Sequence, residues 1–277
     1  MPRTRKADLL VLNASELVTM AGRRRPRQRD ELAHVSAIPD GGLAIRDGKI
    51  LACGRSADIA ARFVQDRGRP LDARGKTVIP GFVDPHTHPV FAGSRESELL
   101  LKLEGKSYLE ILASGGGIQR TVRATRAASQ GELLRSTLER LDCMLLHGTT
   151  TIEGKSGYGL DLDTEMRSLI VMEMADRRHP VDIVRTFLGA HALPAEYRGR
   201  PDDYIDFLVR TALPEAARLN LAEFCDVFCE EGVFTVAQSR RLLLAARKLG
   251  LRPKLHADEI ARTRGAELAA EVGAISA

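Results

Sequence analysis

The sequence predicts an α/β protein, a TIM-like β/α barrel of parallel strands preceded by a small β-rich domain. Beyond residue 78, short apolar segments of strand length alternate with amphipathic segments that have helical spacing. Polar residues suited to a binding site follow several of these strands, a pattern typical of the carboxyl ends of barrel strands. Residues 1–77 instead show short strands and tight turns. We therefore place a β-sandwich-like domain over residues 1–77 and the barrel over residues 78–277.

The first 77 residues are expected to be structural, because no catalytic side chains cluster there. The expected elements are strands over residues 8–12, 42–46 and 50–53, a tight turn over 47–49, and a helix over 56–65 with Ser56 as its N-cap. A turn containing Asp47-Gly48 between two strands is typical of a β-hairpin. Residues 71–77 lead into the first barrel strand.

The barrel region combines apolar strands with amphipathic helices. The strands are expected over residues 78–84, 149–153, 183–189, 224–228 and 253–256. The helices are expected over residues 132–147, 164–178, 202–220 and 236–249. A doubly wound open sheet is the structural alternative, but no Gly-X-Gly-X-X-Gly turn follows a first strand to support it.

The barrel region is too short for a complete barrel. Residues 78–277 comprise 200 residues, whereas a complete eightfold barrel typically needs ~250. A sixth strand is expected to begin near residues 272–276, directly before the chain stops. We therefore expect an incomplete barrel with about six of eight strands, in a chain truncated at its C-terminus.

Composition points to an ordinary globular protein of the cytoplasm. Hydrophobic residues make up 44% of the chain and charged residues 28%, and no segment reaches the ~18 apolar residues that a membrane span needs. The basic N-terminus has an interrupted apolar run and is a poor secretion signal. The four cysteines form no Cys-X-X-Cys pair, which favours reduced, buried thiols.

One basic cluster suggests a function from a different class. Residues 22–29 carry five arginines, and a nucleic-acid-binding arm is one interpretation. No aromatic residue is interleaved and no recognition module lies nearby, so a solvated loop is favoured. A binding arm would also leave the histidines at the strand ends unexplained. We expect neither a nucleic acid nor a membrane as a partner.

The most informative segment is residues 78–88, an apolar strand that ends in two histidines, His86 and His88. Side chains at positions i and i+2 of a strand lie on the same face, so these two imidazoles point the same way. Two neutral imidazoles that converge on one point form half of a metal site. The alternative is a pair of surface histidines, which the position at the end of an apolar strand makes less favourable.

Later strand ends carry further candidates. His191 follows the third barrel strand, and His256 ends the fifth. His256 fits a third metal ligand, although a half-buried structural histidine is the alternative. Glu259 could accept a proton from a metal-activated water or cap the next helix, and the residues alone leave both roles open.

Two glycine-rich segments complete the set of candidates. The first follows the second barrel strand and presents Lys155, Ser156 and Tyr158. The second is Gly115-Gly116-Gly117, followed by Thr121, Arg123 and Arg126. It could cradle a phosphate, but it lacks the Lys-Ser/Thr pair of a P-loop. A flexible lid or a carboxylate-binding loop fits the second segment at least as well.

Six motifs, spread over essentially the whole chain, carry a resemblance to a known enzyme family. They are Pro80 to His88, Phe91 to Arg95, Gly115 to Ile118 with Thr121 and Val122, Lys155 to Leu160, Gly189 to Ala192, and Lys254 to Glu259. The His-X-His strand is shared across the amidohydrolase superfamily, whereas the later motifs are more specific. Together the motifs resemble the imidazolonepropionase family of histidine degradation.

The resemblance implies a barrel of the metal-dependent hydrolase type that holds one zinc or iron ion. The implied metal ligands are His86, His88 and His256. The implied substrate contacts are Arg95, Tyr158, His191, Tyr108 and Glu259, with Glu259 and His256 as the catalytic residues. The implied reaction is hydrolysis of the cyclic amide C–N bond of 4-imidazolone-5-propanoate, which yields N-formimidoyl-L-glutamate. The implied partners are this small substrate and a second copy of the chain in a homodimer.

The resemblance also shows where this sequence departs from the family. Family members continue into an Ala-Asp-His segment and, after the eighth strand, an aspartate that completes the metal shell, and this chain stops before both. We therefore expect the family's activity, but not from these 277 residues alone. The alternative is another amidohydrolase, such as a hydantoinase, a dihydroorotase or a cytosine deaminase. Those with two metals need a lysine on the fourth strand, and Phe224–Phe228 contains none, which favours one metal.

Overall fold

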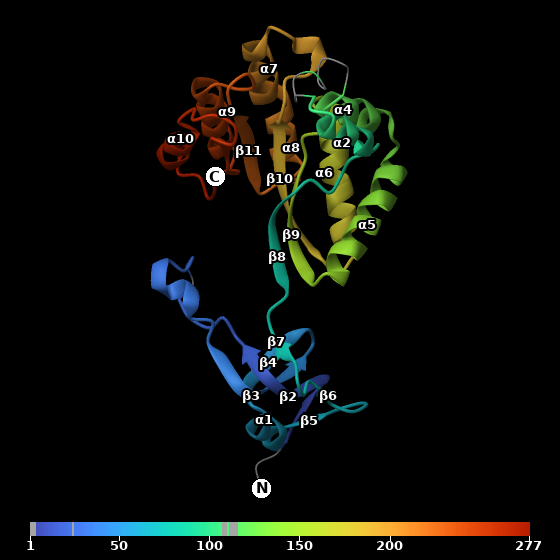
Figure 1. Cartoon of the computed structure of the whole chain (residues 1–277), viewed down its shortest axis with the longest axis vertical. Coiled ribbons are helices and arrows are strands. Elements are labelled where there is room, and N and C mark those ends of the chain that lie inside the picture. The colour runs from blue at the N-terminus through green and yellow to red at the C-terminus, as the bar shows by residue number, and fades with distance from the viewer. Residues whose placement is uncertain (1–3, 24, 107–109, 111–115) are drawn as a thin grey trace. The chain divides into compact units, whose positions relative to one another are not determined.

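The protein was examined as a computed structural model, in which residues 4–23, 25–106, 110 and 116–277 are described. The chain divides into two compact units, a smaller one over Met1–Gly81 and a larger one over Phe82–Ala277. Each unit has its own apolar core, and each is described by itself. Figure 1 shows β-strands in the first unit and alternating strands and helices in the second.

The smaller unit is built around a mixed sheet. Its elements are β1 (Arg5–Ala7), β2 (Leu9–Val18), a 3₁₀ turn (Arg29–Ala33), β3 (Ala37–Arg46), β4 (Lys49–Arg55), α1 (Ser56–Arg62), β5 (Phe63–Gln65), β6 (Leu71–Asp72) and β7 (Thr77–Val78). The sheet order is β4-β3-β2-β6, β7 also pairs with β2, and β1 pairs separately with β5. The predicted hairpin is confirmed: β3 and β4 pair antiparallel around Asp47-Gly48, and both turn residues have positive φ.

The predicted N-cap of the first helix is wrong. Arg55 is the N-cap of α1, and Ser56 is the first helical residue. The hydroxyl of Ser56 is instead buried, donating to the carbonyl of Gly41 and accepting from the amide of Asn13. The helix also ends at Arg62, because the chain then turns into β5 and pairs with β1. Tertiary pairing therefore shortens a helix that local sequence extended to residue 65.

The larger unit contains a parallel sheet with sequential strand order. Its strands are β8 (Phe82–Thr87), β9 (Thr149–Lys155), β10 (Asp182–Ala190), β11 (Phe224–Cys229), β12 (Arg252–Pro253) and β13 (His256–Ala257). Each strand pairs in parallel with the next one along the chain, from β8 to β12. A doubly wound sheet would reverse its order at a switch point, so this order excludes that alternative. The result is the curled sheet of an incomplete barrel.

The sheet has five strand positions rather than about six. β12 and β13 are two pieces of one strand, because both pair with β11 in the same register, Phe224 with Arg252 and Phe228 with His256. The predicted sixth strand over residues 272–276 does not form. Val272 ends a helix, and the following residues contribute only two backbone hydrogen bonds to the fifth strand, from Ile275 to Pro253 and from Leu255 to Ser276.

The predicted helices between the barrel strands are confirmed, with small shifts at their ends. They are α5 (Gln130–Leu146), α6 (Leu162–Asp176), α7 (Pro201–Phe207), α8 (Leu213–Arg218) and α9 (Val236–Lys248). The α5 and α9 helices begin with capping boxes, Ser129 with Glu132 and Thr235 with Gln238. As Figure 1 shows, α5 and α6 lie side by side, and they pack on β9 and β10 respectively.

Several helical features of the described residues were not predicted. A π-helical turn, Leu208–Ala212, joins α7 to α8 just before Pro214, which lacks the amide that would continue an α-helical ladder. Others are the helices α2 (Glu96–Leu103), α4 (Ile118–Ala127) and α10 (Gly265–Val272). The first two follow the His-X-His strand and position residues of the candidate site.

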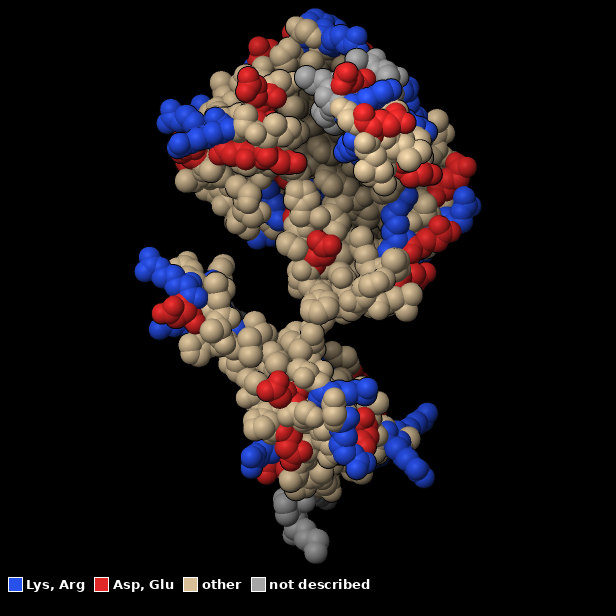
Figure 2. Space-filling view, viewed as in Figure 1, with Lys and Arg blue, Asp and Glu red and all other residues tan. Residues whose placement is uncertain are grey.

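Most charged side chains lie at the surface. Figure 2 shows positive and negative side chains intermixed on the visible face of the larger unit. Some of them pair, for example Arg240 with Glu271 and Arg241 with Asp206. Of the cysteines, Cys225 and Cys229 are buried packing residues as predicted, but Cys53 and Cys143 are exposed, which corrects the prediction of four buried thiols.

Candidate metal centre and adjoining pocket

Three histidines from the two ends of the parallel sheet converge. His86 and His88 come from β8 and the residue just after it, and His256 begins β13. One ring nitrogen from each lies within 4.8 Å of the corresponding nitrogens of the other two. The rings of His86 and His256 are 4.5 Å apart between centroids. Three imidazole nitrogens at this separation can share one metal ion.

The surroundings keep the two β8 histidines suited to a metal. Burial lowers the pKa of His86, and the nearby His256 adds to this effect. Burial also lowers the pKa of His88 to well below its usual value, and the neighbouring His191 acts in the same direction. A lowered pKa keeps an imidazole neutral, and the neutral form is the one that binds a metal. The Nδ1 atom of His88 lies 3.3 Å from the carbonyl oxygen of Ser156, so Nε2 is the ring nitrogen that stays available to a metal.

His191 and Tyr158 extend the cluster as neighbouring rings. His191 stacks on His88 with a centroid distance of 4.7 Å, and Tyr158 lies 5.3 Å from His191 and 5.4 Å from His88. The Nδ1 atom of His191 is 3.0 Å from the carbonyl oxygen of Gly157, so the protein fixes the orientation of this ring. Burial lowers the pKa of His191 to about 4, with the charge of His256 adding to the effect. At neutral pH His191 is therefore uncharged, and its Nε2 atom can accept a hydrogen bond.

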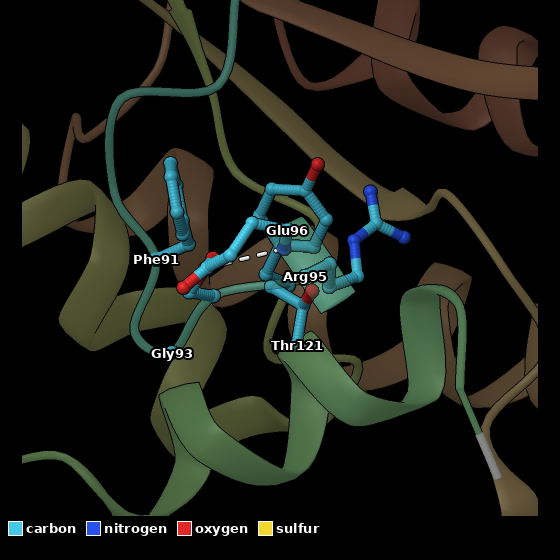
Figure 3. A pocket seen from close by; sticks show the side chains of 7 residues that line it. Phe91, Gly93, Arg95, Glu96 and Thr121 are labelled. Atoms are coloured by element: carbon cyan, nitrogen blue, oxygen red, sulfur yellow. Dashed lines mark hydrogen bonds between the residues drawn. The ribbon is translucent and has the colours of Figure 1, made fainter. Parts of the chain in front are cut away.

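A pocket of about 470 Å³ adjoins these rings on the side of Tyr158. It is lined by Phe91, Gly93, Ser94, Arg95, Glu96, Thr121 and Tyr158, most of which Figure 3 labels. Arg95 is the N-cap of α2, and Thr121 comes from α4, so the two unpredicted helices both contribute to the lining. Tyr158 belongs both to the pocket and to the ring cluster. Tyr158 therefore links the pocket to the ring of His88.

Arg140 of α5 holds the segment that carries the pocket. Its guanidinium donates to the carbonyl oxygens of Pro89 and Phe91 at 2.8 and 3.1 Å. The same guanidinium lies 3.6 Å from the centroid of the Phe91 ring, a cation–π contact. The chain after His88 is thereby tied to a barrel helix, and Phe91 is fixed at the wall of the pocket.

Two further predicted site residues are Tyr108 and Glu259. Tyr108 lies outside the described residues. Glu259 is exposed, and its side chain makes no hydrogen bond or ion pair with any described residue. The alternative helix-capping role of Glu259 is wrong, because Asp258 accepts the hydrogen bonds from the amides of Gly265 and Ala266 at the start of α10.

The phosphate-cradle interpretation of the second glycine-rich segment is not supported. Gly115 lies outside the described residues, and the amide of Gly117 already donates to the buried carboxylate of Glu98 at 2.9 Å. Arg126 forms ion pairs with Asp161 and Glu196. The amide of Gly117 and the guanidinium of Arg126, two groups that could bind a phosphate, are therefore already bound to carboxylates of the protein.

Sequence reasoning missed a buried set of charged residues beneath the histidines. Glu153 and Lys155 of β9, Asp226 of β11 and Lys254 beside β12 have side chains buried inside the curved sheet. Opposite charges two residues apart in a buried strand, as in Glu153 and Lys155, were the available signal. That signal does not identify partners on other strands. Lys155 was instead assigned to the loop after the strand, whereas the structure makes it the last residue of β9.

Comparison with known proteins finds close sequence relatives. The chain is 54% identical to imidazolonepropionase from Symbiobacterium thermophilum over 276 residues, and 51% identical to imidazolonepropionase from Alkaliphilus metalliredigens over 270 residues. The alignments cover 99% and 98% of this chain and 64% of each relative. The chain is therefore similar to imidazolonepropionases over nearly its whole length. It spans less than two thirds of the length of the curated relatives it matches, and no protein-family model matches it.

Solved structures show the same fold as this chain. A 5-methylcytosine deaminase from Klebsiella pneumoniae, liganded with phosphonocytosine, aligns with 95% of this chain and 55% of its own, at a TM-score of 0.64 and 16% identity. A variant of atrazine chlorohydrolase from Arthrobacter aurescens, complexed with zinc and atraton, covers the same shares at a TM-score of 0.52 and 15% identity. These likenesses concern the fold alone, and they confirm the predicted barrel class with its β-rich domain.

Among the described residues, no helix combines the length and the apolar content that crossing a membrane requires.

Proposed function

We propose that this protein is a metal-dependent imidazolonepropionase, which adds water across the cyclic amide C–N bond of 4-imidazolone-5-propanoate and releases N-formimidoyl-L-glutamate. The observation that carries the proposal is a cluster of three histidine nitrogens within 4.8 Å of one another. Tyr158, which lines the pocket together with Arg95, lies 5.4 Å from the ring of His88. The sequence identity of about one half to imidazolonepropionases supports the same substrate.

His86, His88 and His256 would hold the metal. Their nitrogens are close enough to share one ion, and the pKa values of His86 and His88 are lowered, so both fit a cation. When bound, the metal supplies a Lewis acid that activates water and polarises the ring carbonyl. Imidazole ligands accept either zinc or iron. We propose zinc or iron, with zinc supported by its presence in the atrazine chlorohydrolase of the same fold.

Arg95, Tyr158 and His191 would bind and orient the substrate. Arg95 lines the pocket, and its guanidinium can hold the propanoate carboxylate through two parallel, charge-assisted hydrogen bonds. Tyr158 lies between this pocket and His191, so a ligand anchored at Arg95 would reach both rings. The phenol of Tyr158 can donate to the ring carbonyl, and the neutral His191 can accept from a ring N–H. Such anchoring orients the reacting carbonyl before water attacks.

Glu259 and Tyr108 complete the set of proposed catalytic and substrate-binding residues. Glu259 lies in the exposed loop directly after β13, three residues from His256, and we propose that it accepts the proton from the attacking water. Tyr108 is proposed as a further contact to the substrate carboxylate. The homodimer expected from the resemblance stays a prediction.

A metal titration with a matched pair of variants tests the centre. The chain should bind one Zn²⁺ or Co²⁺ per molecule, and His256→Ala should lose this binding. His34→Ala is the control, because His34 is exposed in the smaller unit and its ring contacts only a backbone carbonyl nearby. Full metal content in His256→Ala would show that the ligand assignment is wrong.

A product assay separates the proposed reaction from its alternative. 4-imidazolone-5-propanoate should be converted to N-formimidoyl-L-glutamate by the metal-loaded full-length protein. Another amidohydrolase activity, such as deamination, would instead release ammonia from an amino-substituted ring. Ammonia release from cytosine-type substrates, with no opening of the imidazolone ring, would overturn the proposal in favour of a deaminase.

A further inference from the structure

The inside of the curved sheet holds four buried charges in direct contact. The Nζ atom of Lys155 lies 2.7 Å from a carboxylate oxygen of Glu153 and 2.7 Å from one of Asp226. The Nζ atom of Lys254 lies 2.6 Å from the other oxygen of Glu153. Two positive and two negative groups therefore balance, which offsets the cost of removing them from water. Thr186 also donates to Glu153 and fixes that carboxylate further.

Asp226 connects this charged set to the histidine cluster. Its Oδ2 atom contacts both Lys155, at 2.7 Å, and the Nδ1 atom of His256, at 3.0 Å. Its other oxygen, Oδ1, accepts from the backbone amide of Val227 at 2.7 Å. The carboxylate is therefore held from three directions.

We propose that Asp226, itself fixed by Lys155, is the positioning residue that orients His256 with Nε2 toward the metal. The inference rests on the metal centre proposed above. His256 has two ring nitrogens, and a carboxylate beside Nδ1 favours the form in which that nitrogen carries the proton. The remaining nitrogen, Nε2, is then unprotonated and available as the ligand. A carboxylate behind a ligating histidine also makes that histidine a stronger donor.

The same cluster shows why Asp226 has this role rather than another acidic residue. The carboxylate of Glu153 already contacts Lys155, Lys254 and Thr186. Asp84 accepts from the backbone amide of His86 and does not touch an imidazole among the described residues. The Nδ1 atom of His88 faces a backbone carbonyl instead of a carboxylate. Of the three histidines, His256 is the one with a buried charged partner in the described part of the chain.

The first test uses the unaltered chain and needs no variant. Nitrogen-15 NMR of the zinc-loaded chain, labelled in its histidines, reports which ring nitrogen of His256 carries the proton and which binds zinc. The expected result is a protonated Nδ1 and a zinc-bound Nε2. Zinc bound through Nδ1 would overturn the proposal, because Asp226 would then face the ligating nitrogen.

The second test measures zinc affinity by competition with a chromophoric chelator. Asp226→Asn keeps the size of the side chain and removes its charge, and we expect an affinity loss on the order of 10- to 100-fold. Asp142→Asn is the matched control, since Asp142 lies 3.2 Å from the ring of His179, a histidine outside the cluster. The control should retain the affinity of the unaltered chain.

The outcomes separate this inference from the metal centre on which it rests. If the unaltered chain binds no zinc, the metal centre fails. If it binds zinc and a folded Asp226→Asn chain binds equally well, the centre stands and the positioning role is wrong. Lys155→Met, which frees Asp226 from its cation, should give an intermediate loss. If either variant does not fold, the NMR assignment on the unaltered chain still decides the question.

Discussion

The guanidinium of Arg95 lines the pocket, yet it forms no ion pair or hydrogen bond with any residue that the structure describes. An arginine in a pocket is suited to bind an anionic ligand, because two N–H groups of its planar guanidinium can donate to the two oxygens of a carboxylate. Arg95→Ala should therefore weaken binding of a stable imidazole-propanoate analogue roughly 10- to 100-fold, since hydrogen bonds between charged groups are worth about 1.5–3 kcal/mol. Calorimetric titration of the metal-loaded chain measures this change.

The matched control for Arg95 is Arg135→Ala, which removes an exposed arginine of α5 that does not line the pocket. Metal content should stay unchanged in both variants. Loss of metal in Arg95→Ala would mean that this residue supports the structure of the centre rather than the substrate.

Tyr204 provides a residue-scale test of the barrel itself. Its ring is fully buried, and its hydroxyl donates to the carbonyl oxygen of Gly189 at 2.7 Å. Tyr204→Phe removes the hydroxyl that donates to the buried Gly189 carbonyl. It should lower the free energy of unfolding by about 1–2 kcal/mol, as measured by urea denaturation. Tyr197→Phe is the control and should change stability little, because the Tyr197 hydroxyl forms no hydrogen bond with any described residue. Equal effects in both variants would contradict the role of this hydrogen bond.

At the scale of single elements, the sequence predicted what depends on local periodicity. The strand with His86 and His88 was predictable because alternation places both side chains on one face. The fifth strand was predictable from its apolar residues, and with it the position of His256. The helices from α5 to α9 followed from their amphipathic spacing, and their ends shifted by a few residues at most.

The rest of the site depends on contacts between distant segments, which local patterns do not contain. Lys155 and Asp226 are 71 residues apart, and only the pairing order of the strands brings them together. Asp258 rather than Glu259 caps α10 because Asp258 adopts a left-handed conformation, φ 55°, that turns its carboxylate toward the helix. The sixth strand was mispredicted because an apolar segment of this length fits a helix end as well as a strand.

The loop after β9 is organised by one buried carboxylate from α6. Glu165 accepts from the amides of Gly157, Gly159 and Leu160 at 3.1, 2.8 and 2.9 Å. These residues flank Tyr158, and Gly157 also supplies the carbonyl that orients His191. Burial raises the pKa of Glu165, against the lowering effect of these hydrogen bonds. The position of two proposed substrate contacts therefore depends on this one side chain.

Glu165→Gln should loosen the loop without removing the metal. The amide group of glutamine brings N–H donors toward amides that need an acceptor, so at least one of the three hydrogen bonds is lost. Hydrogen exchange at Gly157, Gly159 and Leu160 should become faster, and analogue binding should weaken. Glu173→Gln, on the same helix and paired with Arg177 at the surface, is the control. Unchanged exchange in Glu165→Gln would mean that the loop is held by its other contacts.

At the scale of the whole molecule, the alternation of strands and helices was enough to predict the fold class. The number of strand positions was not, because the two pieces β12 and β13 and the helix α10 depend on how the chain packs after Lys254. The two units have separate cores, one around Leu10 and Ile59 and the other around Ile152 and Leu169. Separate cores permit the units to unfold in separate transitions, so a single free energy of unfolding need not describe the chain.

The four cysteines report on these units independently. Cys53 is exposed in the smaller unit and Cys143 in the larger one, whereas Cys225 and Cys229 are buried in the core of the larger unit. Burial also raises the pKa of the Cys225 thiol, which makes its reactive thiolate form rarer. A chromogenic disulfide reagent should therefore titrate two thiols in the native chain and four in denaturant.

Replacing both exposed cysteines by serine, Cys53→Ser with Cys143→Ser, isolates the two buried thiols as a probe of the larger unit. Their labelling should be slow in buffer and should accelerate at the denaturant concentration at which the larger unit loses its helical circular dichroism, because most of the helices belong to that unit. Bound zinc should shift this transition to higher denaturant, since a ligand that binds only the folded state stabilises it. Rapid labelling of both thiols in buffer would instead show that the five-stranded sheet does not form a closed core in solution, and the metal centre built on that sheet would then lack its support.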